Sequence, residues 1–233
     1  MNTHRAVLFD LDGTLLKTLD DLADATNAAL AALGLPRRPV EAYKQFVGDG
    51  IKQMVRRAIG GEHPAEFLLD RGIELTRREY ARCWAEKTQP YAGILDLLDE
   101  LGRRGIPTAV LSNKPHEFTR LCVTRLLSRW RFQVIQGAVA ELPRKLHPDG
   151  ALAVAARLSV TSSEVLYLGN TNTDMQTAIA ARMFVVGTLW GCRSLTLWQW
   201  IDTVIRNRLG VGSTGWPSGA ERRRRSWRWH DGC

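Results

Sequence analysis

The sequence predicts an α/β protein whose parallel sheet is interrupted, after its first strand, by a block of helices. Two observations support this prediction. From Gly93 onward, short apolar segments of strand length alternate with helical segments, which is the pattern of a parallel sheet. By contrast, residues 18–88 contain helical segments only. A chain of 233 residues, 45% of them hydrophobic, is long enough for one core with a sizeable insertion.

The expected elements follow one another along the chain. A strand at residues 6–10 leads into a tight turn, and an amphipathic helix at residues 19–33 ends where Gly34 and Pro36 stop it. Two further helices are expected at residues 51–59 and 64–88. The alternating part then comprises helices at 94–103, 115–127, 149–158 and 174–181 and strands at 107–111, 132–136, 164–168 and 183–186.

These elements divide the chain into three parts. Residues 1–17 and 89–203 form the core, residues 18–88 the helical insertion, and residues 204–233 a tail rich in Arg and Trp. From Thr203 onward seven arginines face two acidic residues, so five of the eight net positive charges lie there. We interpret the tail as poorly ordered or altered rather than as a nucleic-acid-binding module. The basic charge therefore does not indicate a nucleic-acid partner for the rest of the chain.

The distribution of apolar residues and cysteines bears on location. No apolar run reaches the roughly 20 residues that a membrane-spanning helix needs. The four cysteines are widely scattered, with no C-x-x-C pair and no neighbouring His. We therefore expect a cytoplasmic protein with reduced thiols and no membrane partner, as either a monomer or a homodimer.

Polar side chains gather where the predicted strands end. Asp10 and Asp12 follow the first strand, so one carboxylate could attack a phosphorus atom while the other exchanges a proton with the leaving oxygen. Ser112 and Asn113 offer a hydroxyl and an amide for phosphoryl oxygens, or could cap the next helix. Lys145 supplies a cation against the growing negative charge. Because the carboxyl ends of parallel strands meet at one edge, these residues predict a phosphoryl-transfer site.

A metal site is predicted at the same edge of the sheet. Asn170 and Asp174 follow the strand at residues 164–168, and with Asp10 they offer the oxygen ligands that Mg²⁺ prefers. Structural alternatives stay open at this point. Asp174 could cap its helix, Asn170 could be a turn residue, and Lys145 could belong to a solvated basic loop.

Four segments resemble, in order and at similar intervals, the four motifs of the haloacid dehalogenase superfamily. They are Asp10 to Thr14, Leu111 to Lys114, Lys145 before Pro148, and Gly169 to Asp174. The resemblance covers about residues 5–191, and residues 20–24 and 46–50 look like phosphoglycolate phosphatases in particular. It implies a Rossmann-like core with a small helical cap, here residues 18–88.

The resemblance also implies a function. It implies a Mg²⁺-dependent phosphatase for a small phosphorylated metabolite, with 2-phosphoglycolate as the leading candidate. Asp10 would form an aspartyl-phosphate, and Asp12 would serve as general acid and base and place its backbone carbonyl near the metal. The metal ligands implied are thus Asp10, Asp12, Asn170 and Asp174. The cap would close over the site and select the substrate. The substrate-binding residues implied are Thr14, Ser112, Asn113, Gly50 and Lys52.

Three residues depart from the family pattern. Asn170 stands where relatives carry Asp, so we expect weaker metal binding and reduced activity. Lys17 replaces an acidic residue before the first cap helix, and Arg182 replaces a Gly that a left-handed turn would favour. Two alternatives therefore remain beside the phosphoglycolate phosphatase. They are a phosphosugar phosphatase or mutase with the same core, and a catalytically weakened relative that acts as a binding protein.

Overall fold

The computed structural model describes residues 4–61, 64–188 and 190–191. Its main sheet contains five parallel strands in the order β5-β4-β1-β6-β7. The strands are β1 (Ala6–Phe9), β4 (Thr108–Pro115), β5 (Val134–Ala138), β6 (Val165–Gly169) and β7 (Phe184–Gly187). The predicted fold class is therefore confirmed. The predicted tail, residues 204–233, lies outside the described residues.

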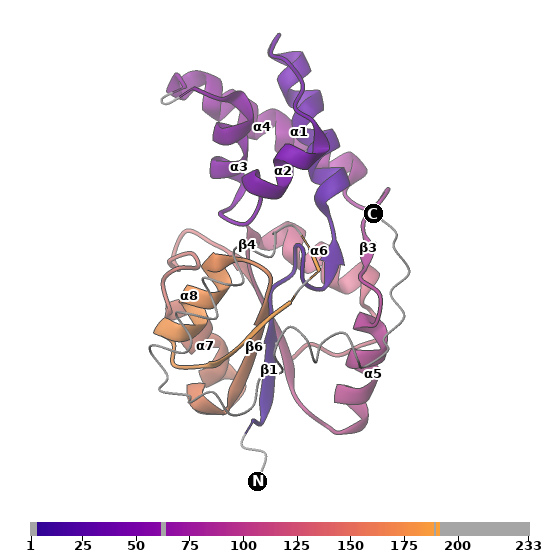
Figure 1. Ribbon diagram of the computed structural model, residues 1–233, viewed down its shortest axis with the longest axis vertical. Helices are drawn as coiled ribbons and strands as arrows, with labels where there is room; N and C mark the ends of the chain where they lie inside the picture. The colour runs from indigo at the N-terminus through magenta and orange to yellow at the C-terminus, as the bar shows by residue number, and fades with distance from the viewer. Residues whose placement is uncertain (1–3, 62–63, 189, 192–233) are drawn as a thin grey trace, which may run out of the picture. The chain divides into compact units, whose positions relative to one another are not determined.

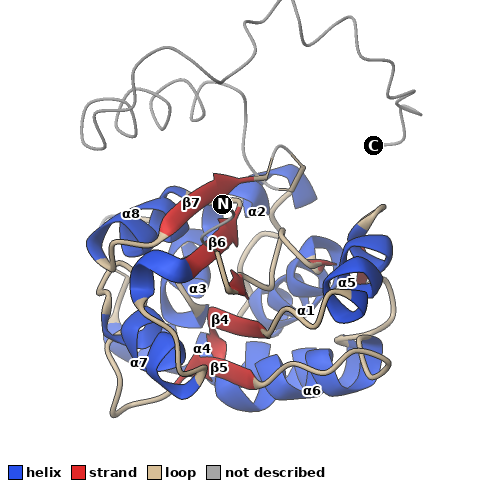
Figure 2. Ribbon diagram, turned by 90° about the horizontal axis from the view of Figure 1, so that it is seen from below, coloured by secondary structure: helices blue, strands red, loops and turns tan. Residues whose placement is uncertain are grey.

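Helices cover both faces of this sheet (Figure 2). On one face lie α7 (Asp149–Arg157) and α8 (Asn172–Ala180), and on the other α5 (Ile94–Arg103) and α6 (His116–Leu126). Successive residues of β1 point to opposite faces of the sheet. Leu8 packs with apolar residues of α7 and α8, whereas Phe9 packs with apolar residues of α5 and α6. A central strand covered on both faces is apolar throughout, as the sequence of β1 is.

The insertion is helical in its described residues (Figure 1), and its helices enclose an apolar core to which Phe118 of α6 also contributes. The helices of the insertion are α1 (Leu19–Ala32), α2 (Val40–Phe46), α3 (Ile51–Ile59) and α4 (Glu66–Cys83). Two short antiparallel strands, β2 (Leu16–Lys17) and β3 (Gln89–Pro90), pair where the insertion leaves and rejoins the rest of the chain. None of the helices in the described ranges is long and apolar enough to cross a membrane.

The structure differs from the sequence prediction in a few elements. The helix α2 was not predicted as a separate element, and α4 ends at Cys83 rather than at residue 88. The strand β4 runs on to Pro115, four residues beyond its predicted end, and Ser112, Asn113 and Lys114 are all buried in it. At Arg182, φ is 57°, so this side chain does occupy a left-handed turn that favours glycine.

Candidate active site

Asp10 lies directly after β1, the central strand of the sheet. Its backbone N–H donates to the Leu168 carbonyl (2.9 Å), so β6 still holds the chain where β1 ends. The chain then turns at Gly13, where φ is 86° and where a side chain would collide with the amide of Asn170. Only glycine fits this turn. The arrangement leaves Asp10 just 4% exposed.

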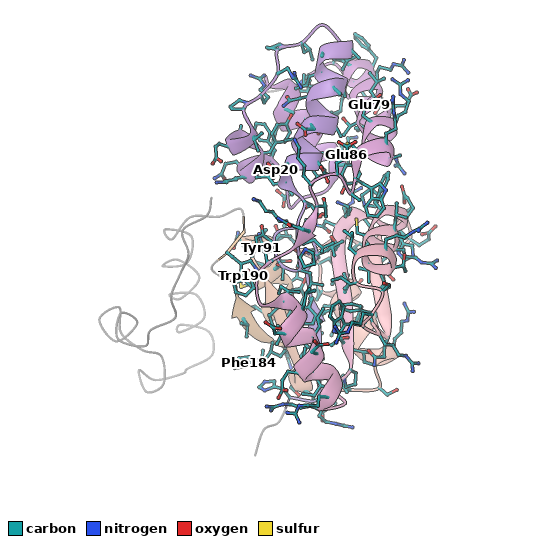
Figure 3. All side chains as sticks on the ribbon, turned by 90° about the vertical axis from the view of Figure 1, so that its right-hand side faces the viewer. Asp20, Glu79, Glu86, Tyr91, Phe184 and Trp190 are labelled. Carbon is teal, nitrogen blue, oxygen red and sulfur yellow. The ribbon has the colours of Figure 1, made fainter. Side chains whose placement is uncertain are left out.

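Thr14 and Trp190 hold the far side of this turn. The Trp190 indole Nε1 donates to the Thr14 carbonyl (3.0 Å), and its ring lies beside Tyr91 with 6.4 Å between the ring centroids (Figure 3). The Thr14 hydroxyl donates to Asn170 Oδ1 (3.1 Å) and lies 3.5 Å from Asp10 Oδ2. Thr14 is fully buried behind Asp10, so its contacts are with protein groups, and substrate binding by its side chain stays a prediction.

Lys145 joins two carboxylates that lie far apart in the sequence. Its Nζ atom lies 2.6 Å from Asp10 Oδ1 and 2.7 Å from Asp174 Oδ1. All three side chains are buried. The solvated-loop alternative for Lys145 is therefore wrong, because its ammonium lies inside the molecule at the nucleophile predicted from the sequence.

The charges at this cluster do not balance. Burial and the neighbouring Asp174 carboxylate raise the pKa of Asp10 to about 7, although Lys145 opposes the shift. Burial alone would lower the pKa of Lys145, but the charges of Asp10 and Asp174 raise it well above its usual value. One ammonium thus faces two buried carboxylates, so a further positive charge at this cluster would be electrostatically favourable.

Asp174 also takes part in the capping box at the N-terminus of α8. Its Oδ2 atom accepts from the backbone N–H (3.0 Å) and the hydroxyl (2.6 Å) of Thr171, whose hydroxyl accepts from the Asp174 N–H in turn. The N-cap of α8 is therefore Thr171, and Asp174 stands three residues into the helix rather than at its cap. Its Oδ1 atom receives Lys145 and, at 3.3 Å, the Tyr167 hydroxyl. Both oxygens are engaged by protein groups, so a metal-ligand role for Asp174 stays a prediction.

Asn170 lies next to the predicted nucleophile. It is buried, its Oδ1 atom accepts from Thr14, and its Nδ2 atom has no hydrogen-bond partner among the described residues. Within those residues, no three His, Cys, Asp or Glu side chains gather closely enough to hold a metal ion. An oxygen set for Mg²⁺ would therefore include the Asn170 amide oxygen and the Asp12 carbonyl beside the Asp10 carboxylate. Such oxygens, with the unbalanced negative charge nearby, fit a hard cation.

Asn113 orders the loop that carries Lys145. Its Oδ1 atom accepts from the Lys145 backbone N–H (2.9 Å), and its Nδ2 atom donates to the carbonyls of Lys145 (3.4 Å) and Gly48 (3.1 Å). Neither Asn113 nor Ser112 caps α6, whose N-cap is Pro115 without a side-chain bond. The Ser112 hydroxyl instead accepts from the Lys114 N–H (3.2 Å).

Lys114 is a buried cation to which the sequence prediction gave no role. Its Nζ atom lies 3.0 and 3.2 Å from the two carboxylate oxygens of Asp12, and 4.6 Å from the centroid of the Tyr80 ring in the cap. Burial alone would lower the pKa of Lys114, but the charge of Asp12 raises it above its usual value. The one available signal was that a basic residue directly follows two predicted site residues, Ser112 and Asn113.

A cavity of about 50 Å³ lies between these core residues and the cap. Its polar lining comes from predicted and unpredicted residues together. Of the predicted residues it includes Asp10, Asp12, Gly50, Ser112, Asn113 and Lys145. Lys52 is exposed and does not line the cavity, because Ile51, Met54 and Val55 occupy the inward face of α3.

Residues 7–188 match the family of haloacid dehalogenase-like hydrolases, which is more than half of the chain. The chain belongs to this family. A phosphoglycolate phosphatase of Pseudomonas putida is 34% identical over 191 residues, which make up 80% of this chain and 70% of the relative. A phosphoglycolate phosphatase of Nitrosospira multiformis is 32% identical over 192 residues, 80% of this chain and 84% of the relative.

Solved structures agree with this family assignment. A protein of Lactobacillus delbrueckii subsp. bulgaricus, provisionally assigned as a phosphoglycolate phosphatase, superimposes with a TM-score of 0.80. It is 29% identical, and the match covers 88% of this chain and 98% of that one. A haloacid dehalogenase-like hydrolase of Streptococcus pneumoniae, 20% identical, shares the fold with a TM-score of 0.77 over 87% of this chain and 92% of its own.

The cap loop of this haloacid dehalogenase-like chain contacts the core through Asp49. The Thr173 hydroxyl, in the first turn of α8, donates to Asp49 Oδ1 (2.9 Å), and Arg57 of α3 pairs with Asp49 Oδ2 (2.6 Å). Together with the Asn113 bond to the Gly48 carbonyl, these contacts hold residues 48 and 49 against the core, and Gly48 lines the cavity. Neither Asp49 nor Thr173 was among the predicted site residues.

Proposed function

We propose that this haloacid dehalogenase-like hydrolase is a phosphatase that cleaves the phosphate ester of a small organic acid, with 2-phosphoglycolate as the leading substrate. The observation that carries the proposal is the 2.6 Å contact between Lys145 and Asp10 at the end of β1, in a cavity that Asp12 also lines. The names of the Pseudomonas and Nitrosospira relatives support the choice of substrate. The small cavity favours a small metabolite.

In the first step, an Asp10 carboxylate oxygen would attack the phosphorus atom. A bond forms between that oxygen and phosphorus, and the ester bond between phosphorus and the substrate oxygen breaks. Asp12, which pairs with Lys114 in the free protein, would take up a proton from solvent when the anionic substrate binds and give it to the leaving alkoxide. Lys145 would hold Asp10 in place and offset the negative charge that grows on the phosphoryl oxygens. Ser112, which lines the same cavity, would donate to one of those oxygens.

In the second step, water would release the phosphate. Asp12, now ionised, takes a proton from the water, whose oxygen bonds to phosphorus while the bond between phosphorus and Asp10 breaks. Inorganic phosphate leaves, and both aspartates return to their starting states. Lys114, paired with Asp12 in the free protein, would orient the Asp12 carboxylate for both proton transfers.

Mg²⁺ is the proposed cofactor. The Asp10 carboxylate, the Asp12 carbonyl and the Asn170 amide oxygen would hold it, with Asp174 as a further candidate. When bound, the ion would neutralise charge on the transferred phosphoryl group. Asn170 supplies an oxygen but no negative charge, so we propose that metal affinity, and with it turnover, is lower than an Asp at this position would give.

Hydrolysis of an aryl phosphate tests the proposal. The purified chain should release phosphate in a Mg²⁺-dependent manner, and Asp10→Asn should abolish the release. A rate that Asp10→Asn leaves unchanged would refute the enzyme proposal and favour the binding-protein alternative. A panel that contains 2-phosphoglycolate and phosphosugars then separates the leading substrate from the phosphosugar alternative, since the highest kcat/KM identifies the preferred class.

A further inference from the structure

Two hydroxyl groups in the cap are buried beside the cavity and make no hydrogen bond of normal geometry to a described residue. Thr76 and Tyr80 stand one turn apart on α4, at positions i and i+4, so they share a face of that helix. Both residues line the cavity, and they are 0% and 3% exposed. Neither the Thr76 Oγ1 atom nor the Tyr80 hydroxyl makes a hydrogen bond of normal geometry to a described residue, although the Tyr80 hydroxyl lies close enough to the Lys114 ammonium to interact with it.

Buried hydroxyls without a normal hydrogen bond are costly, and folded proteins contain few of them. Two of them on one helical face beside a cavity therefore call for a common explanation, and a ligand that accepts hydrogen bonds supplies it. Of the other cap residues that line the cavity, Gly48 and Gly50 have no side chain, and Leu22, Val47, Ile51 and Met54 are apolar. Thr76 and Tyr80 are therefore the cap side chains in this lining that can offer hydrogen bonds.

The core supplies a cation on the same side of the cavity. The Lys114 ammonium contacts both carboxylate oxygens of Asp12, lies 4.6 Å from the centroid of the Tyr80 ring, and interacts with the Tyr80 hydroxyl. Lys114 is also buried, so its charge acts in a low-dielectric environment. A cation beside two hydroxyl donors favours an anionic oxygen group over a neutral one.

We infer that Thr76, Tyr80 and Lys114 form a subsite that binds the carboxylate of the substrate while the phosphoryl group lies at Asp10. The inference rests on the proposed function and deepens it, because it makes the substrate class a phosphorylated hydroxy acid.

The test compares two ligands that differ only in the carboxylate. Binding of 2-phosphoglycolate and of ethyl phosphate, which carries a methyl group instead, is measured by calorimetry on an Asp10→Asn background that cannot turn the ligand over. We expect 2-phosphoglycolate to bind at least tenfold more tightly. Three substitutions test the subsite: the isosteric changes Thr76→Val and Tyr80→Phe, and Lys114→Met. Each should lower the ratio of the two affinities about 10- to 100-fold, or to one if the original ratio is smaller than that.

Matched controls come from the same cap. Thr26 and Tyr43 are also buried, but their hydroxyls donate to the Leu22 carbonyl and to Asn27 Oδ1, and neither residue lines the cavity. Thr26→Val and Tyr43→Phe should lower the thermal midpoint and leave the ratio unchanged. Thr76→Val and Tyr80→Phe should change the ratio without lowering the midpoint, because each removes a hydroxyl that makes no hydrogen bond of normal geometry.

Equal affinities for the two ligands, or a ratio that all three subsite substitutions leave unchanged, would overturn the inference. Failure of the proposed function has a different signature. The unsubstituted chain would then hydrolyse neither compound in the presence of Mg²⁺, while the binding ratio and its response to the substitutions would stand.

Discussion

The ammonium of Lys145 lies between Asp10 Oδ1 (2.6 Å) and Asp174 Oδ1 (2.7 Å), so one buried cation holds two buried carboxylates together. Asp10 comes from the end of β1, Asp174 from the start of α8, and Lys145 from the loop before α7. This contact therefore links three segments of the core at a single point, next to the proposed reaction centre.

The first prediction concerns this cluster. Lys145→Met leaves two carboxylates buried without their cation. This should destabilise the fold by about 3–5 kcal/mol and lower kcat/KM by about 100-fold or more. Urea denaturation and aryl phosphate turnover measure the two effects. The control is Lys87→Met, which removes an exposed lysine that pairs with Asp24 and should change both quantities little. Equal effects of the two substitutions would contradict the role given to Lys145.

The second prediction concerns the metal. Asn170→Asp adds a carboxylate beside Asp10 and removes the unpartnered Nδ2 group, so the Mg²⁺ concentration for half-maximal turnover should fall about tenfold. A Mg²⁺ titration of turnover measures this. Asn172→Asp adds the same charge two residues further along and should have a much smaller effect. If Asn170→Asp and the unsubstituted chain titrate alike and turn over equally fast, the proposed weakening by Asn170 is wrong.

The third prediction concerns cap closure. Asp49→Ala removes the acceptor of both Thr173 and Arg57, so the cap loop should dock less well and kcat/KM should fall about 3- to 10-fold. Glu41→Ala serves as control, because it breaks an ion pair that lies wholly within α2. The contact between Asp49 and Thr173 would be irrelevant to closure if kcat/KM stayed at its original value in Asp49→Ala.

The fourth prediction concerns backbone strain. At Arg182, φ is 57° and the side chain is exposed, so Arg182→Gly should stabilise the fold by about 1 kcal/mol. Ala153→Gly, at an exposed position inside α7, should destabilise it by about the same amount, since glycine disfavours helix. Thermal denaturation of both variants gives the comparison. A loss of stability in Arg182→Gly would show that the turn carries no strain.

The sequence predicted the architecture well because its local signals agree with the fold. The apolar run of β1 is buried on both faces, and the helical period of α1 and α3 matches the faces that pack in the cap. The strand β4 was predicted too short, because Ser112, Asn113 and Lys114 are polar yet buried in it. Contacts with the loop that carries Lys145 and with the cap stabilise these buried polar residues, and no local pattern in the sequence reveals those contacts.

The site was predicted in part. Motif residues gave Asp10, Asp12 and Lys145, and the structure brings all three to one cavity. The pairing of Lys114 with Asp12, 102 positions away, depends on how β1 and β4 align and on the rotamer of a long side chain. The buried hydroxyls of Thr76 and Tyr80 likewise become visible only once α4 is packed against the core, because the sequence there shows no more than an amphipathic helix.

The central claim is that Asp10 is the nucleophile, and rapid quenching tests it most directly. The chain is mixed with Mg²⁺ and excess 2-phosphoglycolate, quenched in acid within a single turnover, and digested for mass spectrometry. We predict that the peptide containing Asp10 gains the mass of one phosphoryl group, and that Asp10→Asn loses both this species and hydrolysis. Hydrolysis that persists in Asp10→Asn, or a phosphoryl group on another residue, would contradict the account.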